Sequence, residues 1–432
     1  MKPGPKVYFI ACCFPPFGRG NSLTNACAAN GLAEELPVEV VCMEQEAGLL
    51  LSYQQDPSLE AGLHPNLKIH RVRAARWAGL NEVLYALGLL PCYYLNWAWK
   101  AWRQRHRLFA EPGVLFAVYP VFSDLALAYA VQRRYGHPLV VDFRDDFSGV
   151  MSRGWRRVLR PVYHWMEGGL LRRAAQVTVT TEALKADLAR RHQVDPDKIR
   201  VVYNIVPTEG APRNPVENQP LRLVYAGAMS AVQRPEILLQ AYALLRQRRP
   251  DVGEQVQLDL FGPASHYYRL RVQPHLVPGA TFHGFVPHDQ VAAHLRRADL
   301  GFLSLGDPVY AYATPTKLFE YIEHGIPMLG ALPPGASRDL ILRHGLGLVA
   351  GAGDVEGLAG CLEQLCCQPE FRQGLRENLA RVRLLFRPEA QVQKWRAALA
   401  AAAGQEALWP LPAAQPNLVG SDAKGNTKPE LE

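Results

Sequence analysis

The sequence predicts an α/β protein with two Rossmann-like, doubly wound domains that face each other across a cleft. Mostly apolar runs alternate with helical patterns, which is typical of a parallel sheet covered on both faces. The alternation stops at a proline-rich segment, residues 206–220, and then starts again. The length of 432 residues, with 48% hydrophobic and 20% charged side chains, suits a globular protein of about two or three domains.

The first predicted domain covers residues 1–205. Its strands are expected at residues 6–13, 38–43, 67–72, 114–119, 138–143, 176–180 and 199–203, and its helices at 23–35, 123–135 and 182–191. The longest uncharged run, residues 83–99, is close to the lower length limit of a membrane span. Because Pro91 and Asn96 interrupt this run, we expect a core helix or a partly inserted interfacial segment there.

Residues 206–220 are expected to be a linker, and residues 221–384 a second domain of the same kind. Its strands are expected at residues 221–225, 256–261, 280–285, 300–305 and 327–331, and its helices at 234–246, 289–297 and 315–323. Residues 385–402 are predicted to form a closing helix and residues 403–432 a disordered tail. Ligands of open α/β sheets bind at the carboxyl ends of the strands, so we expect the site in the cleft between the domains.

The chain is basic, with a formal net charge of +7 and a pI near 9.0. Arginines gather in the first half, and tryptophans lie between them: Arg71, Arg73, Arg76, Arg103, Arg105, Arg107, Arg153, Arg156, Arg157, Arg160, Arg172 and Arg173, with Trp97, Trp99, Trp102, Trp155 and Trp165. A single cluster of this kind indicates a solvated helix face. Several such arginine and tryptophan clusters in one half of the chain favour a patch that contacts an anionic membrane surface. No helix-turn-helix, zinc-finger or RNA-recognition signature occurs, so we expect no nucleic-acid partner.

The eight cysteines include no C-x-x-C pair, which argues against a zinc ribbon or a thioredoxin-type site. We expect free, buried thiols in a reducing compartment. The predicted location is therefore cytoplasmic, and peripheral on the inner face of the cell membrane if the basic patch binds lipid.

The segment from Thr314 to residue 321 predicts a binding site for an anion. Thr314 is expected to be the N-cap of a helix and Pro315 its first residue. Lys317 then lies in the first turn, where the helix dipole already makes the field positive, so a bound phosphate is the simplest explanation. Glu320 follows on the same face and offers acceptors to a sugar diol. The alternative is a surface Lys–Glu pair on an ordinary helix.

A second candidate lies after the first predicted strand. Gly18 and Gly20 would let backbone N–H groups approach an anion at the start of the next helix. A dinucleotide-binding fingerprint would need a third glycine where the sequence has Leu23, so NAD or FAD binding is disfavoured.

These motifs carry a family resemblance over roughly residues 6–400. The chain resembles GT-B glycosyltransferases, specifically the retaining group 1 (family 4) type that uses nucleotide-sugar donors and builds bacterial surface polysaccharides. The shared motifs are P-P-x-G-x-G after the first strand, D-F-R-D at residues 142–145, the segment 174–204, Y-A-G at residues 225–227 and P-T-K-L-F-E-Y at residues 315–321.

The resemblance implies a role for each matching residue. Lys317, with Thr316 beside it, would hold the donor diphosphate, and Glu320 would bind the ribose hydroxyls. Gly227 would let the backbone approach the diphosphate, and Arg234 could supply a second cation. The remaining matches would face the donor or acceptor from the first domain: Gly18, Gly20, Arg144 and Asp145, the last two as candidate catalytic residues. Donor binding would need neither a metal nor a cofactor, because the nucleotide sugar is a substrate and Lys/Arg side chains and helix N-termini stabilise the leaving diphosphate.

The sequence departs from the family pattern at three positions. Leu125 stands where relatives have a histidine, Ala231 where the loop after Gly227 often has a lysine, and Tyr312 where many have a second glutamate. The leading prediction is sugar transfer from a nucleotide sugar to a lipid-linked or glycan acceptor. The departures leave a non-catalytic, nucleotide-binding scaffold as an alternative, and a nucleotide-sugar epimerase of the same fold as another.

Overall fold

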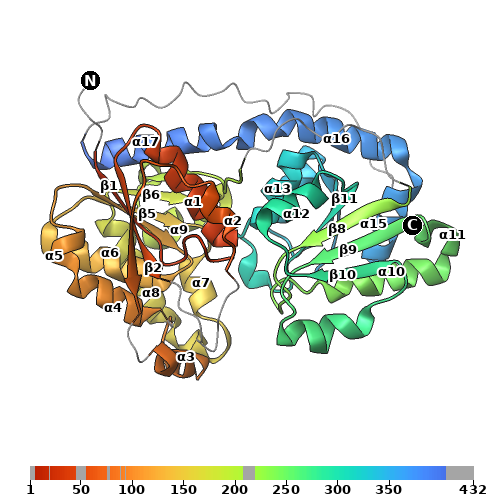
Figure 1. Cartoon of the computed structure of the whole chain (residues 1–432), viewed down its shortest axis with the longest axis horizontal. Coiled ribbons are helices and arrows are strands. Elements are labelled where there is room, and N and C mark those ends of the chain that lie inside the picture. The colour runs from red at the N-terminus through yellow and green to blue at the C-terminus, as the bar shows by residue number, and fades with distance from the viewer. Residues whose placement is uncertain are drawn as a thin grey trace.

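The computed structural model describes the following residues: 5–18, 20–44, 55–74, 78–87, 89–92, 94–207 and 219–404. The core of the predicted linker and all but the first residues of the predicted tail lie outside these residues, as does Arg76. Two α/β lobes lie side by side, the N-terminal lobe in red to yellow and the C-terminal lobe in green to blue (Figure 1). The predicted fold class is confirmed.

The N-terminal lobe is built on a seven-stranded, all-parallel sheet with the strand order β3-β2-β1-β4-β5-β6-β7. Its strands are β1 (Val7–Ile10), β2 (Val38–Glu44), β3 (Lys68–Arg73), β4 (Val114–Tyr119), β5 (Leu139–Phe143), β6 (Gln176–Val179) and β7 (Ile199–Val201). Its helices are α1 (Gly20–Ala33), α2 (Ser58–Ala61), α3 (Ala78–Ala86), α4 (Leu95–Arg103), α5 (Arg105–Leu108), α6 (Phe122–Tyr135), α7 (Phe147–Met151), α8 (Arg160–Arg173) and α9 (Glu182–His192).

The C-terminal lobe repeats this plan with a six-stranded parallel sheet in the order β10-β9-β8-β11-β12-β13. Its strands are β8 (Leu221–Ala226), β9 (Val256–Phe261), β10 (Ala280–Gly284), β11 (Leu300–Ser304), β12 (Met328–Ala331) and β13 (Gly347–Ala350). Its helices are α10 (Glu236–Arg248), α11 (Pro250–Gly253), α12 (His288–Leu295), α13 (Thr316–His324), α14 (Ala336–His344), α15 (Val355–Cys367) and α16 (Pro369–Arg383).

The inner strands of both sheets are buried on both faces, which explains why they are apolar, whereas the edge strands β3 and β10 are partly exposed. In β1, Val7 and Phe9 belong to one hydrophobic core, whereas Tyr8 and Ile10 belong to the core on the other face. Successive side chains of a strand point to opposite faces, so each apolar run supplies two cores at once. The central strand of the second lobe, β8, divides its side chains in the same way.

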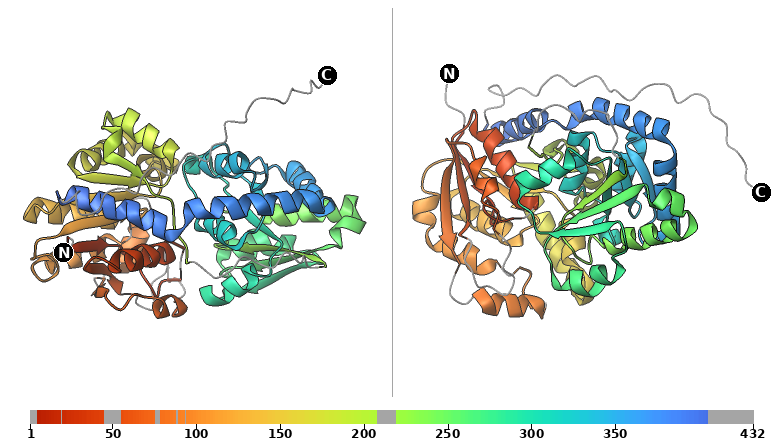
Figure 2. Two further views of the ribbon diagram at one scale, coloured as in Figure 1. Left: turned by 90° about the horizontal axis from the view of Figure 1, so that it is seen from above. Right: turned by 45° about the vertical axis from the view of Figure 1, so that its right-hand side comes forward.

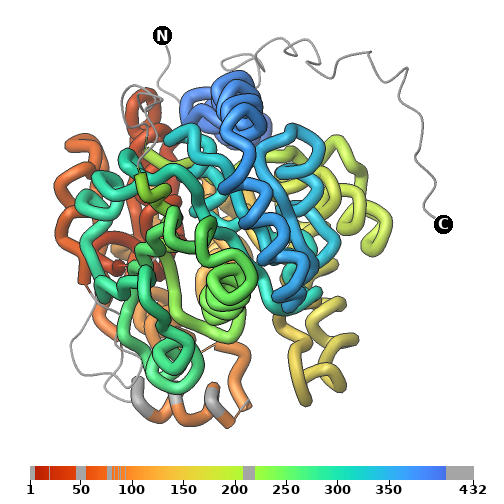
Figure 3. The backbone as a smooth tube through the Cα atoms, turned by 90° about the vertical axis from the view of Figure 1, so that its right-hand side faces the viewer, coloured from red at the N-terminus to blue at the C-terminus, as the bar shows by residue number. Residues whose placement is uncertain are grey.

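The last helix, α17 (Pro388–Ala402), leaves the C-terminal lobe and packs on the N-terminal lobe (Figure 2). Trp395 is buried and meets the ring of Phe116 edge to face at 6.2 Å. Arg396 is also buried, and its Nη1 donates to Oε1 of Glu35, two residues after the end of α1, at 2.6 Å. Figure 3, in which the C-terminal lobe faces the viewer, shows the C-terminal helices in blue along one side of the molecule. The chain therefore crosses between the lobes a second time.

The expectation of a single core helix over residues 83–99 was wrong. The described residues there form the end of α3 and the start of α4, which Pro91 separates. Trp97 is fully buried in the lobe core, whereas Trp99 is 41% exposed. Among the described residues, no helix combines the length and the apolar character that crossing a bilayer requires.

Candidate donor and acceptor site

The helix that carries Lys317 begins one residue later than the sequence predicted. Pro315 occupies the cap position without a side-chain cap, and α13 starts at Thr316. Thr314 is therefore not the N-cap. Its side chain is buried, and its carbonyl accepts a hydrogen bond from Nδ2 of Asn204 at 2.8 Å. Thr314 thus joins the two lobes, while Lys317 remains in the first turn of α13, as expected.

Lys317 is 5% exposed and lies over the carboxyl end of β8. Its Nζ donates to Oε1 of Gln233 and lies 4.0 Å from the ring centroid of Tyr225. Burial lowers the pKa of Lys317 to about 7, although the nearby carboxylate of Glu320 opposes the shift. An ammonium group here is costly until an anion arrives, which is the behaviour expected of a phosphate-binding lysine.

Glu320 is the next candidate along the same helix. Its side chain is 14% exposed, and its Oε1 lies 3.1 Å from Nε2 of His288 at the start of α12. Because Lys317 is buried and Glu320 nearly so, the alternative of a surface Lys–Glu pair is excluded. His288 is itself tied to the other lobe, since its backbone N–H donates to Oδ2 of Asp56 at 2.8 Å.

The first turns of α1 and α13 meet where the two lobes touch. A Cβ atom added to Gly20, the first residue of α1, would lie 3.2 Å from Oγ1 of Thr316, the first residue of α13. Gly18 lies in the loop between β1 and this turn. Two helix N-termini therefore point their free N–H groups and positive dipole ends at one place. This is a suitable site for a diphosphate.

Buried oxygens without partners lie in the first turn of α1. Oδ1 of Asn21 and Oγ of Ser22 are buried and have no hydrogen-bond partner among the described residues. A buried polar atom without a partner carries a desolvation penalty. A ligand with hydroxyl or amide donors would remove that penalty.

Glycine at the end of β8 leaves room for the end of the Lys317 side chain. A Cβ at Gly227 would lie 2.6 Å from Nζ of Lys317, and the backbone N–H of Gly227 donates to the carbonyl of Phe261 at 3.0 Å. At the end of β9, a Cβ at Gly262 would collide with the carbonyl oxygen of Gly227. The loops after β8 and β9 can therefore approach each other and Lys317 closely, because neither glycine has a side chain.

Arg234 has a different environment from Lys317. Its Nε lies 3.4 Å from Oε1 of Glu236, and its side chain packs against Gly306, where a Cβ would collide with it. The residue that contacts Lys317 from this loop is Gln233, which the sequence reasoning missed. Ala231, at the position compared with the family lysine, is exposed in the same loop.

Arg144, which was predicted on the acceptor side, is held by contacts inside the N-terminal lobe. Arg144 is 6% exposed, its Nε donates to Oδ2 of Asp142 at 2.8 Å, and its Nη1 donates to Oγ1 of Thr24 at 2.6 Å. Both partners belong to the N-terminal lobe, so Arg144 joins β5 to α1 instead of lining an open surface. Its Nη2 is buried and has no partner among the described residues.

Asp145 is half-buried and forms no hydrogen bond or ion pair with the described residues. Burial raises its pKa to about 7, and the charge of Asp146 acts in the same direction. Its charge also acts on two phenols, Tyr119 of the same lobe and Tyr310 of the other. A carboxylate with a raised pKa at the boundary between the lobes is a candidate for proton transfer or for binding a hydroxyl.

Two of the three departures from the family pattern have structural roles. Leu125 is 1% exposed and fills the N-terminal core. Tyr312 packs on the same core from the other lobe and hydrogen-bonds the side chain of Asp187 on α9. Tyr312 is therefore a contact between the lobes.

Comparisons with known proteins agree with this arrangement. The "Glycosyl transferase 4-like domain" family model matches residues 22–204, and the "Glycosyl transferases group 1" model matches residues 209–382. The chain is 25% identical over 304 residues to alpha-D-kanosaminyltransferase of Streptomyces kanamyceticus, covering 64% of this chain and 74% of that protein.

Solved structures share the fold over almost the whole chain. Anabaena Alr3699/HepE in complex with UDP and glucose has a TM-score of 0.64 at 15% identity, covering 92% of this chain and 99% of that one. WaaG, a glycosyltransferase involved in lipopolysaccharide biosynthesis, has a TM-score of 0.62 at 16% identity, covering 91% and 99%. Since the two family models divide the chain where its two sheets divide, and the whole has the fold of these enzymes, the chain belongs to the group 1 glycosyltransferases of the GT-B fold, which use nucleotide-sugar donors.

Proposed function

We propose that this glycosyltransferase moves a sugar from its nucleotide donor to a lipid-linked or glycan acceptor, in the assembly of cell-surface polysaccharide. The observation that carries the proposal is the buried Lys317 beside the meeting point of two helix N-termini. Relatives that were solved with UDP and glucose, or that are involved in lipopolysaccharide biosynthesis, support this choice of donor and pathway class.

Glycosyl transfer places negative charge on the departing diphosphate, and the chain supplies matching positive charge. Lys317 would take up a proton when the diphosphate binds, and the first turns of α1 and α13 would add N–H donors. Glu320 would accept hydrogen bonds from the ribose hydroxyls, with His288 fixing the carboxylate. In this proposal the reaction needs no metal ion and retains the anomeric configuration.

Asp145 is the candidate for the acceptor side. Its raised pKa suits a group that accepts a proton from, or hydrogen-bonds, an acceptor hydroxyl near neutral pH. Tyr310 would face it from the other lobe, in a position held by the bond from Nη1 of Arg153 to the hydroxyl of Tyr310 at 2.9 Å. Closure of the lobes and completion of this side of the site would therefore occur together.

An exposed apolar surface on the N-terminal lobe fits a lipid-linked acceptor. We define the apolar patch by its exposed side chains on α3 and the residue after it, on α8 and on the turn before α8: Leu80, Val83, Leu87, Trp155, Val158, Val162 and Trp165. Arg156, in the turn before α8, joins this turn to the α3 segment, since its Nη2 donates to the carbonyls of Tyr85 and Leu90 at 3.1 Å each. Exposed cations, Arg157 and Arg160, lie in the same segment. Apolar side chains rimmed by arginine suit the headgroup region of an anionic membrane.

The test is a donor screen with the purified chain. UDP-, GDP- and dTDP-sugars are offered, and release of the nucleoside diphosphate is measured with and without acceptor. We expect one donor class to be turned over and Lys317→Ala to abolish turnover, whereas Lys185→Ala on α9 leaves it unchanged. Equal donor binding by wild type and Lys317→Ala would overturn the proposal.

The second candidate function is a scaffold that binds a nucleotide without catalysis. It is favoured by Tyr312, which packs between the lobes where relatives have a carboxylate, and by Gln233, a neutral partner for Lys317. Turnover of any donor by the isolated chain would exclude it. The apolar patch argues against a nucleotide-sugar epimerase, because an enzyme of small soluble substrates has no use for such a surface.

A further inference from the structure

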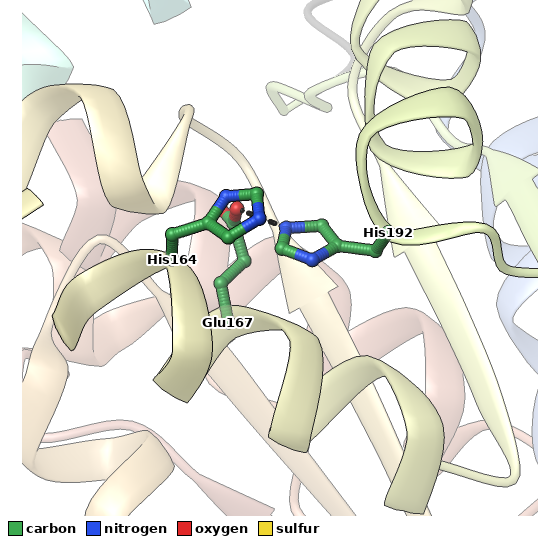
Figure 4. A group of neighbouring side chains, drawn as sticks. All are labelled: His164, Glu167 and His192. Atoms are coloured by element: carbon green, nitrogen blue, oxygen red, sulfur yellow. Dashed lines mark hydrogen bonds and ion pairs between the residues drawn. The ribbon is translucent and has the colours of Figure 1, made fainter. Parts of the chain in front are cut away.

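Two histidines and a glutamate come together on α8 and α9, which contribute none of the donor-site residues described above (Figure 4). His164 and Glu167 are three residues apart on one face of α8, and His192 is the last residue of α9. One ligand atom from each residue lies within 4.8 Å of the other two. The imidazole rings of His164 and His192 stack with their centroids 4.2 Å apart.

We propose that these three side chains form a binding site for a divalent transition metal, with Zn²⁺ as the expected ion. Two imidazole nitrogens and one carboxylate oxygen are a common protein donor set for Zn²⁺, and a water molecule completes such sites. Zn²⁺ is borderline-soft, so it prefers imidazole more strongly than Mg²⁺ or Ca²⁺ does.

The surroundings of Glu167 already hold its carboxylate in place. Glu167 is fully buried, and its Oε1 accepts a hydrogen bond from the backbone N–H of Ser148 at 3.1 Å. Its Oε2 lies 2.6 Å from Nε2 of His192. An outer hydrogen bond of the kind that Ser148 supplies orients a metal-bound carboxylate. Only Oε2 of Glu167, the oxygen that faces His192, would need to change partners.

Metal binding must displace two interactions of Oε2. His192 would present Nε2 without its proton, which moves to Nδ1 or to solvent. Nη2 of Arg191 lies 3.5 Å from the same oxygen and repels a cation. However, the guanidinium of Arg191 has other acceptors, at 3.0 Å from Oδ1 of Asp146 and 3.3 Å from Oδ2 of Asp187. Because of this arginine we expect weaker binding than in a closed structural zinc site.

A bound ion would fasten α8 to α9. His164 is partly exposed, which gives the metal a route from solvent, and the next residue, Trp165, belongs to the apolar patch. The metal would therefore stabilise the helix that carries part of this patch. It would leave the donor site chemically unchanged.

The test uses the full chain after removal of metals with a chelator. Titration with Zn²⁺ alone should give one site per chain by calorimetry. At about 100 times the dissociation constant, Zn²⁺ should raise the melting temperature by roughly 5 °C. Co²⁺ should give visible absorption typical of a low-coordinate site. His164→Ala, which removes a partly exposed ligand and should fold normally, should weaken Zn²⁺ binding by at least about tenfold.

His266→Ala is the matched control, because His266 is an exposed histidine of the C-terminal lobe. It should bind Zn²⁺ as wild type does. The proposal fails if wild type binds no stoichiometric Zn²⁺, or if His164→Ala binds it with unchanged affinity. Since neither readout depends on sugar transfer, failure here would leave the proposed function untouched.

Discussion

Donor binding should weaken steeply as the pH rises above neutral, because Lys317 is buried in the free protein and its pKa is lowered to about 7. A bound diphosphate favours the ammonium form, so the pKa in the complex rises above this range. If only the ammonium form binds, the dissociation constant scales with one plus the ratio of neutral to charged lysine. Between about pH 7 and pH 8.5 this factor grows from about 2 to about 33, a weakening of roughly 16-fold.

Isothermal titration calorimetry measures this effect directly. The ligand is the nucleotide sugar found in the donor screen, because its phosphodiester groups do not titrate in this interval. Titrations in two buffers with different ionisation enthalpies should show uptake of about half a proton at pH 7 and nearly one at pH 8.5. Lys317→Met should bind weakly at both pH values and take up no proton. A wild-type affinity that is independent of pH would refute the role assigned to Lys317.

The same burial predicts that Lys317 destabilises the free protein. The pKa of Lys317 lies below its usual value of 10.5, so between these two values the unfolded chain holds more protons, and folding stability from this group rises with pH. At neutral pH, Lys317→Met should therefore raise the melting temperature while weakening donor binding. A lower melting temperature would mean that the bond from Lys317 to Gln233 outweighs the cost of burying the amine.

Three further predictions concern other parts of the site. Gly227→Ala places a methyl group 2.6 Å from Nζ of Lys317, so the ammonium group must shift. Donor affinity measured by calorimetry should then fall about tenfold or more, with little change in melting temperature. Unchanged affinity would refute this contact. Asp145→Asn should slow transfer. Because burial raises the pKa of Asp145 from 3.8 to about 7, this group lowers the folding stability as the pH rises between these two values, and the loss is complete above about pH 7. The variant should therefore melt at a higher temperature than wild type at pH 7 and above, and a lower melting temperature would contradict the assignment. Trp165→Ser together with Val162→Ser should reduce sedimentation with anionic liposomes at low salt while leaving donor hydrolysis intact, and unchanged sedimentation would exclude the apolar patch as the lipid contact.

Much of the fold could be predicted because parallel strands buried on both faces have a strong signature. Runs such as the one that forms β4 lack any polar position, and short turns separate them from helices. Lys317 could be placed as well, since a lysine in a first helical turn is unfavourable without an anion. The position of Lys317 within its helix depends on local sequence alone.

Features that depend on distant contacts could not be predicted. Thr314 is a good N-cap by residue type, yet its carbonyl is used by Asn204 of the other lobe and the helix starts after Pro315. Gln233 has no distinctive local signal, and its contact with Lys317 arises only where the loop after β8 meets α13. The family resemblance implied an acceptor-side position for Arg144, but its contacts with Thr24 and Asp142 inside the lobe depend on tertiary structure.

The histidine–glutamate cluster shows the same limit. The spacing of His164 and Glu167 places both on one side of a helix, but His192 joins them only because α9 ends beside α8. The course of α17 is another case, since a helix was expected there but not its packing against α1.

A crystal structure of the chain with its nucleotide donor bound would test the assigned diphosphate site most directly. We predict that the diphosphate lies between the first turns of α1 and α13, within hydrogen-bonding distance of Nζ of Lys317, and that Glu320 contacts the ribose. A diphosphate bound elsewhere, with Lys317 still bonded to Gln233, would contradict it.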